Sequence, residues 1–254
     1  MTKYRKAGMI MINTKVWAHR GASGYAPENT LEAFKMAAEM GADGVELDVQ
    51  LTKDGEIVVI HDEKIDRTSN KEGLVKDYTL DELKKFNFNN GNEEYSYVQI
   101  PTLKEVYELL KPYNMKINVE LKTGIFFYDG IEEKVLKLAK EMDMEDRIIY
   151  SSFNHYSVMK IKELESKAET GLLYADGWIN VVEYAENLKV NALHPALYNV
   201  QYDGLIEKCK KSGIKLHVWT VNGEEEMKKL VESGIEAIIT NYPDKAIKVI
   251  EDNK

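Results

Sequence analysis

Residues 44–62 read GVELDVQLTKDGEIVVIHD, in which two runs of mostly alternating apolar and polar residues flank Asp54 and Gly55. An Asp-Gly pair between such runs predicts a β-hairpin with a two-residue turn. A connection this short cannot join parallel strands. Residues 56–61 are therefore expected to run back antiparallel to the strand that precedes them.

The same hairpin is expected to gather polar side chains on one face. With Asp54 and Gly55 at the centre of the turn, Asp48 lies opposite His61. Glu46 shares the face of Asp48, because side chains two apart in a strand point the same way. Taken alone, the segment also fits a satisfied polar cluster on an exposed ribbon, and both interpretations stay open at this point.

Short β-rich runs alternate with helical patterns along the whole chain of 254 residues. The expected strands are residues 15–19, 44–48, 116–122, 147–152, 168–174, 190–195, 214–220 and 236–240. The expected helices are residues 30–40, 102–110, 131–142, 155–167, 179–188, 202–212, 224–233 and 244–250. Eight strand–helix units in this length predict an α/β fold, the (β/α)₈ TIM barrel, with an open doubly wound sheet as the main alternative.

One segment departs from this alternation. Residues 62–100 are polar and rich in Asn, Lys and Glu, with a single short helical pattern at 79–86. An insertion of this length is usually functional. We expect residues 1–254 to form a single TIM-barrel catalytic domain, with residues 62–100 as a small inserted subdomain after strand two. It is expected to lie over the barrel mouth, the end at which the parallel strands finish.

The third expected strand, residues 116–122, reads KINVELK and places Asn118, Glu120 and Lys122 on one polar face. Barrel strands are normally buried on both faces, and their outward face meets the helices. The polar face is therefore expected to point into the barrel. Buried charges are unfavourable unless they are paired or bind a metal, so internal salt bridges are the alternative to a metal site.

Formal charges favour the metal site. Glu46, Asp48 and Glu120 carry three negative charges, which Ca²⁺ or Mg²⁺ satisfies through oxygen ligands. With a dication, Arg20 and Lys122 added, the formal total is +1. That total matches a substrate with one negative charge, as a phosphodiester has.

The first expected strand ends in Trp17-Ala18-His19-Arg20, followed by Gly21. Residues at the carboxyl ends of barrel strands form the catalytic face, so His19 and Arg20 are candidates for the site. Phe153 follows the fourth expected strand at the same face, where it either packs against substrate or fills the top of the barrel.

Composition excludes several classes of partner. The formal net charge of −9 disfavours binding to nucleic acid and to anionic membranes. No run approaches the roughly 18 apolar residues of a membrane-spanning helix, and the apolar run at residues 9–12 is too short for a signal peptide. We expect a cytoplasmic protein without stable membrane insertion. The sequence does not indicate its oligomeric state.

Taken together, these residues resemble the glycerophosphodiester phosphodiesterase family. The matching pieces span most of the chain and, although each is ordinary alone, are specific in combination. They are His19-Arg20-Gly21, Pro27-Glu28-Asn29-Thr30, Glu46-Leu47-Asp48-Val49, Thr52-Lys53-Asp54-Gly55, Val59-Ile60-His61-Asp62, Arg67-Thr68, Pro101-Thr102-Leu103, Glu120-Leu121-Lys122 and Trp219-Thr220-Val221-Asn222.

The resemblance implies a role for each candidate residue. A divalent cation, Ca²⁺ or Mg²⁺, would be held by Glu46, Asp48 and Glu120. His19 and His61 would form the acid–base pair, and of the two possible assignments we favour His19 as acid and His61 as base. Arg20 and Lys122 would bind the phosphate, and Trp219 would line the glycerol side of the site.

The implied reaction hydrolyses a small glycerophosphodiester to glycerol 3-phosphate and a free alcohol such as choline, ethanolamine or glycerol. The glycerol 2-hydroxyl would attack phosphorus, and water would open the resulting cyclic phosphate. Two alternatives stay open. A lysophospholipase D-like enzyme would need an apolar groove or membrane-seeking segment near the mouth, and the polar insertion at residues 62–100 offers none. A non-catalytic phosphodiester-binding barrel would not need both histidines and all three carboxylates.

Overall fold

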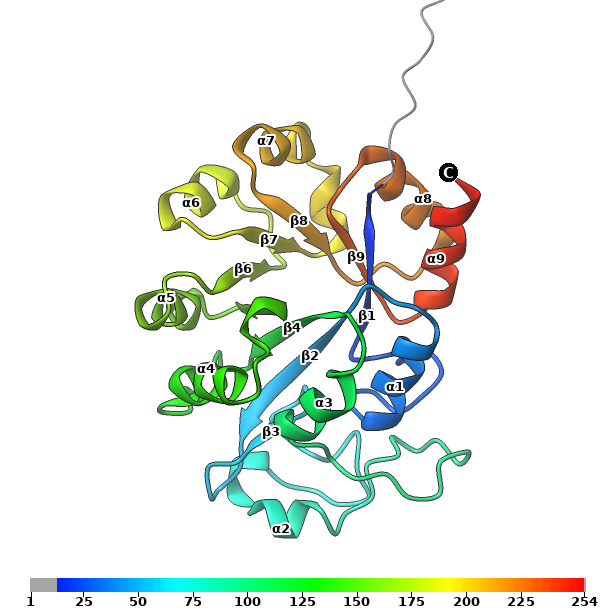
Figure 1. The fold of residues 1–254 in the computed structure, drawn as a ribbon, viewed down its shortest axis with the longest axis vertical. Coiled ribbons are helices and arrows are strands. Elements are labelled where there is room, and N and C mark those ends of the chain that lie inside the picture. Colours follow the sequence, from blue (N-terminus) through cyan, green and yellow to red (C-terminus); the bar gives the residue numbers. More distant parts are fainter. Residues whose placement is uncertain (1–12, 254) are drawn as a thin grey trace, which may run out of the picture.

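Eight parallel strands close into a barrel in residues 13–253, the part of the chain that the computed structural model describes (Figure 1). The apolar run at residues 9–12 lies outside the described residues. The strands follow one another in chain order, and β1 pairs with both β2 and β9. The barrel strands are β1 (Lys15–His19), β2 (Gly44–Leu51), β4 (Lys116–Leu121), β5 (Ile148–Ser152), β6 (Glu169–Tyr174), β7 (Ala192–Pro195), β8 (Lys215–Val218) and β9 (Ala237–Thr240).

A helix separates each barrel strand from the next and packs on the outside, so the predicted TIM barrel is confirmed and the open sheet is excluded. These helices are α1 (Leu31–Glu39), α3 (Leu103–Leu110), α4 (Ile131–Glu141), α5 (His155–Leu164), α6 (Val181–Leu188), α7 (Leu205–Ser212), α8 (Glu224–Ser233) and α9 (Pro243–Asp252). Residues 13–253 also contain three short 3₁₀ turns, η1 (Val75–Asp77), η2 (Glu145–Arg147) and η3 (Leu197–Gln201). Among the described residues, no helix is both long and apolar enough to cross a bilayer.

Successive side chains of β2 point alternately toward the surrounding helices and into the barrel interior. Val45 and Leu47 are buried in one apolar cluster with Phe34 of α1 and Val106 of α3. The intervening side chains, including Glu46, belong to the opposite face. The strand is buried along its whole length, so its polar residues are inside the barrel as predicted.

The hairpin after β2 is antiparallel as predicted, but the predicted pairing is wrong by one residue. β3 (Ile57–Val59) pairs with β2 so that Val49 is opposite Val59, and the backbone N–H of Ile60 donates to Asp48 O at 2.9 Å. Asp48 is thus opposite Ile60 and not His61. The turn holds three residues instead of two, since Thr52 N–H donates to the carbonyl of Glu56 at 3.0 Å.

Gly55 explains the longer turn. Its φ of 80° lies in the left-handed region, which is typical of the last residue in a three-residue hairpin loop. An Asp-Gly pair fits both loop lengths, so the sequence signal identifies the hairpin without fixing its register.

The insertion between β3 and α3 has a small apolar core of its own. It contains η1 and the short helix α2 (Leu80–Leu83), which begins with the capping box of Thr79 and Glu82. Its buried apolar side chains Ile65, Val75, Leu83, Phe88 and Ile100 pack in one cluster with Val58 and Ile60 of the hairpin. In Figure 1 the insertion lies beyond β3, on the side of the barrel that carries α1 and α3.

Two buried histidines pack inside the barrel away from the exposed loops. His217 Nδ1 and His194 Nε2 are 2.8 Å apart, and the ring of His217 lies 4.4 Å from that of Trp17. Burial lowers the pKa of His194 to about 3, so this imidazole is neutral. Both residues are buried in the core.

Gly171 makes room for this pair. A Cβ at residue 171 would lie 2.2 Å from His194 Nε2, which the contacts with His217 and Trp17 prevent from moving. We expect Gly171→Ala to destabilise the fold by about 1–3 kcal/mol through overpacking. Thermal unfolding should show a Tm lower by roughly 2–4 °C for each kcal/mol. Gly124→Ala is the matched control, since no atom lies within 4 Å of its added Cβ, and an equal Tm loss in both variants would contradict this explanation.

Candidate active site

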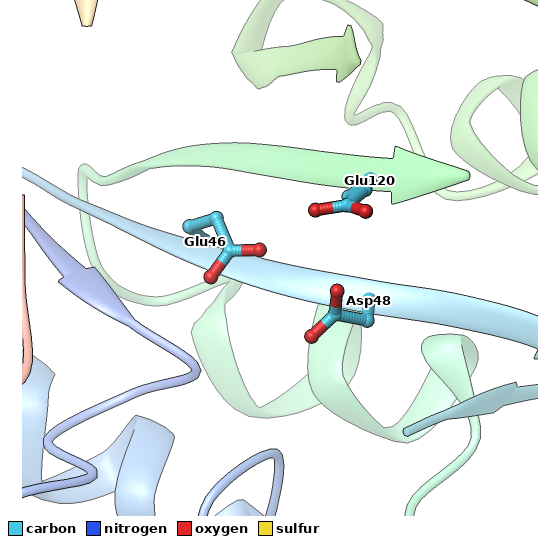
Figure 2. Close-up of side chains that lie close together, drawn as sticks. All are labelled: Glu46, Asp48 and Glu120. Atoms are coloured by element: carbon cyan, nitrogen blue, oxygen red, sulfur yellow. The ribbon is translucent and has the colours of Figure 1, made fainter. Parts of the chain in front are cut away.

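Three buried carboxylates meet inside the barrel between β2 and β4 (Figure 2). Glu46 and Asp48 come from β2, and Glu120 comes from β4 at the register position of Asp48. One oxygen from each carboxylate lies within 4.8 Å of the others. Figure 2 shows the three side chains pointing toward a common space, so the structure brings these predicted residues together.

The three carboxylates of this cluster are buried and repel one another. Burial and repulsion from Asp48 raise the pKa of both Glu46 and Glu120. Burial also disfavours the charge of Asp48, but Arg20, together with other nearby cationic groups, outweighs it and holds the pKa of Asp48 well below its usual range. Asp48 Oδ1 is buried without a hydrogen-bond partner. A free carboxylate oxygen in a repulsive oxygen cluster is the donor set that a hard dication prefers.

Arg20 and Lys122 border the cluster. Arg20 follows β1 with a left-handed φ of 55°, and its backbone N–H donates to Glu46 Oε2 at 3.0 Å. Its guanidinium Nε lies 3.4 Å from Asp48 Oδ2. Lys122 Nζ donates to Glu120 Oε1 at 3.0 Å and lies 4.0 Å from Asp48 Oδ1. The site therefore holds two cations among three carboxylates.

His19 is oriented by an amide from the far end of the chain. Its Nδ1 donates to Asn241 Oδ1 at 2.7 Å, and its Nε2 lies 3.9 Å from Glu46 Oε2. The side chain is only 15% exposed. Burial, reinforced by the charge of Arg20, lowers the pKa of His19 to about 4. His19 is thus a neutral imidazole at neutral pH, with Nε2 directed at the carboxylate cluster.

His61 is oriented by a carboxylate. It follows β3 in a bend, and its Nδ1 donates to Asp62 Oδ1 at 2.6 Å. His61 lies near enough for its charge to act on Asp48 and Glu120. His61 is not opposite Asp48 across the hairpin, contrary to the prediction, and the bend after β3 sets its position. Both histidines therefore use Nδ1 for orientation and leave Nε2 for chemistry.

A chain of ion pairs links the two sides of the site through residues to which the sequence interpretation assigned no role. Arg67 of the insertion donates to Asp62 Oδ2 at 2.7 Å and to both oxygens of Glu28 at 2.7 and 2.8 Å. Glu28 also accepts from Arg20 at 2.9 Å. Glu28, Asp62 and Arg67 belong to the Pro27–Thr30, His61-Asp62 and Arg67-Thr68 pieces of sequence on which the family resemblance rests, so the sequence did mark them as candidate site residues. For Asn241, only its position directly after β9 pointed to the catalytic face of the barrel.

Phe153 and Trp219 lie together at the ends of β5 and β8. Their rings meet edge to face with centroids 5.5 Å apart, and the indole N–H of Trp219 donates to His194 O at 2.7 Å. Phe153 is 44% exposed. The pair forms an apolar wall at the mouth, and the hydrogen bond fixes the indole in place.

Known proteins share this sequence and fold. The model of the glycerophosphoryl diester phosphodiesterase family matches residues 19–245. A glycerophosphodiester phosphodiesterase from Caldanaerobacter subterraneus subsp. tengcongensis is 47% identical over 94% of this chain and 98% of its own length. One from Bacillus altitudinis is 41% identical over 95% of this chain and 100% of its own length.

Solved structures agree with these relatives. An Oleispira antarctica phosphodiesterase in complex with the product sn-glycerol-3-phosphate superposes with a TM-score of 0.83. It is 32% identical and covers 93% of this chain and 96% of its own. A glycerophosphodiester phosphodiesterase from Thermotoga maritima gives a TM-score of 0.78 at 33% identity, over 93% of this chain and 98% of its own.

Proposed function

The chain belongs to the glycerophosphoryl diester phosphodiesterase family, and from that membership we propose that it hydrolyses glycerophosphodiesters to glycerol 3-phosphate and an alcohol. The observation that carries the proposal is the meeting of three buried carboxylates, with His19 Nε2 3.9 Å from Glu46 Oε2, at the end of the barrel where ligands bind. The same reaction is consistent with the product found in the Oleispira antarctica structure.

We propose that Glu46, Asp48 and Glu120 hold a divalent cation, either Ca²⁺ or Mg²⁺. The unpartnered Asp48 Oδ1 and the raised pKa of both glutamates support this, because a cation would relieve the repulsion between the carboxylates. When bound, such a cation would supply charge stabilisation to the phosphoryl oxygens.

Arg20 and Lys122 would bind the phosphate of the substrate. Both side chains are largely buried, at 17% and 13% exposed, and both keep N–H groups beyond those used by their carboxylate partners. Charged hydrogen bonds in such a poorly hydrated site stabilise the charge that develops during phosphoryl transfer.

The surroundings of the two histidines favour the reverse of the assignment preferred from the sequence. His19 is neutral and has a neutral amide partner, which suits a base that removes the proton of the glycerol 2-hydroxyl. His61 has a carboxylate partner, which stabilises an imidazolium able to protonate the leaving alkoxide. In this first step a bond forms from the 2-oxygen to phosphorus, and the bond to the leaving oxygen breaks.

The second step would reverse the proton transfers. His61, now neutral, would remove a proton from water as the water oxygen bonds to phosphorus. His19, now protonated, would return its proton to the 2-oxygen as that bond to phosphorus breaks. Both imidazoles end in their starting states, so the cycle balances.

Two further parts of the predicted site are an aromatic lining and the inserted subdomain. We propose that Trp219 and Phe153 line the side occupied by the glycerol and that residues 62–100 form a subdomain at the mouth. The edge-to-face contact of the two rings supports the first assignment. The ion pairs of Arg67 with Asp62 and Glu28 support the second, since they tie the insertion to both the β3 and β1 sides of the site.

The proposal is tested by glycerol 3-phosphate release from glycerophosphocholine, glycerophosphoethanolamine and glycerophosphoglycerol, with and without EDTA. We expect product from at least one substrate, loss of turnover in EDTA, and recovery with excess Ca²⁺ or Mg²⁺. Equal rates under chelation would overturn the metal-dependent mechanism. Binding of all three substrates without product would instead support a non-catalytic barrel.

A further inference from the structure

Besides Phe153, five large apolar side chains are exposed on the segments along one side of the barrel mouth. Ile125 and Phe127 follow β4 and are 67% and 72% exposed. Tyr156 is in the first turn of α5 and is 88% exposed, and Trp178 and Ile179 follow β6 at 41% and 86%. We call these five residues the apolar rim. Single exposed apolar residues are ordinary, but several on adjoining loops usually mark an interaction surface.

The loops of the apolar rim are neighbours. β4 pairs with β5 and β5 with β6, all in parallel, so the segments that follow these strands leave the barrel at the same end. This is also the end that holds the candidate site, since Lys122 directly precedes the loop of Ile125. Phe153, between β5 and α5, contacts Trp219 and connects the rim with the mouth.

The charge of these loops excludes several partners. Residues 123–130, 153–159 and 175–182 contain no Lys or Arg, and their acidic residues are Asp129 and Asp176. Lys76 of the insertion lies 5.0 Å from the ring centre of Phe126, but it is paired with Asp77 at 3.1 Å. Such a surface on a chain of net charge −9 does not attract anionic lipid or nucleic acid.

We propose that the apolar rim docks on the surface of zwitterionic phospholipid, with the barrel mouth facing the head groups. A mixture of Trp, Tyr and aliphatic side chains on loop segments that contain no Lys or Arg fits the interfacial region of a neutral bilayer. A protein seated on the rim would cover the mouth beside it, whereas a fluid lipid surface leaves room for substrate to enter. The docking extends the proposed function and does not depend on it.

The experiment measures binding of the full chain to phosphatidylcholine vesicles by co-sedimentation and by tryptophan fluorescence, to which Trp17, Trp178 and Trp219 contribute. We expect the wild-type chain to sediment with the vesicles and its tryptophan emission to shift to shorter wavelength as Trp178 leaves water. The triple variant Ile125→Ser, Phe127→Ser, Ile179→Ser keeps Trp178 and should bind at least about tenfold more weakly, because it loses apolar area from the docking surface.

Leu164→Ser is the matched control. Leu164 is also apolar and 41% exposed, but it is the last residue of α5, away from the mouth, and its replacement should leave vesicle binding unchanged. Turnover of soluble glycerophosphocholine in all variants tests the proposed function separately. The docking proposal is overturned if the wild-type chain does not bind phosphatidylcholine, if it prefers anionic phosphatidylglycerol vesicles, or if the triple variant binds equally well. Dissociation of a dimer in the triple variant would assign the rim to a second copy.

Discussion

Alanine at His61 is expected to slow the release of choline from glycerophosphocholine by about 10²–10⁴-fold, and most of that loss should vanish with a better leaving group. The reason is that an acid matters only when the departing oxygen is basic. Choline leaves as an alkoxide that needs a proton, whereas p-nitrophenolate leaves without one. In a single turnover, His61→Ala should therefore release p-nitrophenolate from glycerophospho-p-nitrophenol at a rate close to that of the wild-type enzyme, whereas the second step, in which His61 is the base, stays slow.

His19→Ala provides the comparison. A base that deprotonates the glycerol 2-hydroxyl is needed whatever group leaves, so this variant should be slow on both substrates by a similar factor. Single-turnover kinetics of leaving-group release from the two substrates separate the roles, because steady-state turnover also includes the second step, in which His61 acts as the base. Both variants should retain the thermal stabilisation that Ca²⁺ or Mg²⁺ gives, because neither side chain is a proposed ligand. The opposite substrate pattern would make His19 the acid, and unchanged rates would overturn the acid–base assignment.

The barrel and the meeting of its carboxylates were predictable because both follow from short-range rules. Alternation places Glu46 and Asp48 on one face of β2, and parallel pairing of neighbouring strands places Glu120 beside them. Neither step needs knowledge of a turn or a loop. Each follows from strand periodicity and from the rule that barrel strands finish at one end.

The hairpin register and the partners of the histidines were less predictable. Gly55 adopts the same left-handed conformation in two competing turn types, and the choice moves His61 by one position relative to Asp48. Asn241 is 222 residues from His19 in sequence, and only the closing contact of β1 with β9 brings them together. Such contacts depend on tertiary geometry that no local pattern records.

The apolar rim could not be predicted from the sequence, for a different reason. The run Ile125-Phe126-Phe127 has the composition of a buried segment, and nothing in the sequence marks Ile125 and Phe127 as exposed. The insertion at residues 62–100, the segment that departs from the strand–helix alternation, is polar and predicts no apolar surface near the mouth. The structure places that surface on the loops after β4, β5 and β6, which are adjacent only in the closed barrel.

Glutamine at Glu46 is expected to stabilise the metal-free protein while abolishing both cation binding and turnover. Glu46 Oε2 accepts a hydrogen bond from Arg20 N–H, and the glutamine oxygen can keep it. The substitution removes one charge from a buried cluster whose members repel one another. In EDTA at neutral pH, the Tm of Glu46→Gln should therefore exceed that of the wild-type protein, by roughly 2–4 °C for each kcal/mol of repulsion relieved.

The raised pKa of Glu46 predicts how the Tm difference between Glu46→Gln and the wild-type protein changes with pH. The pKa of Glu46 is raised in the folded state, so its contribution to stability is complete below its unfolded value near 4.5 and is lost as pH rises through the folded pKa. In EDTA the Tm advantage of Glu46→Gln should grow as pH increases over that range. Glu56→Gln, which changes an exposed glutamate in the neighbouring hairpin, is the control and should show no such trend.

Adding the cation should reverse the order of stability. At about 100 times its Kd, a ligand stabilises the folded state by about 2.7 kcal/mol, which would raise the Tm of the wild-type protein by several degrees. Glu46→Gln should show little of this increase, because it has lost a ligand and a negative charge. If the variant instead melts below the wild-type protein in EDTA and still gains stability from Ca²⁺ or Mg²⁺, the three carboxylates are held by internal ion pairs with Arg20 and Lys122. They would then not form a metal site.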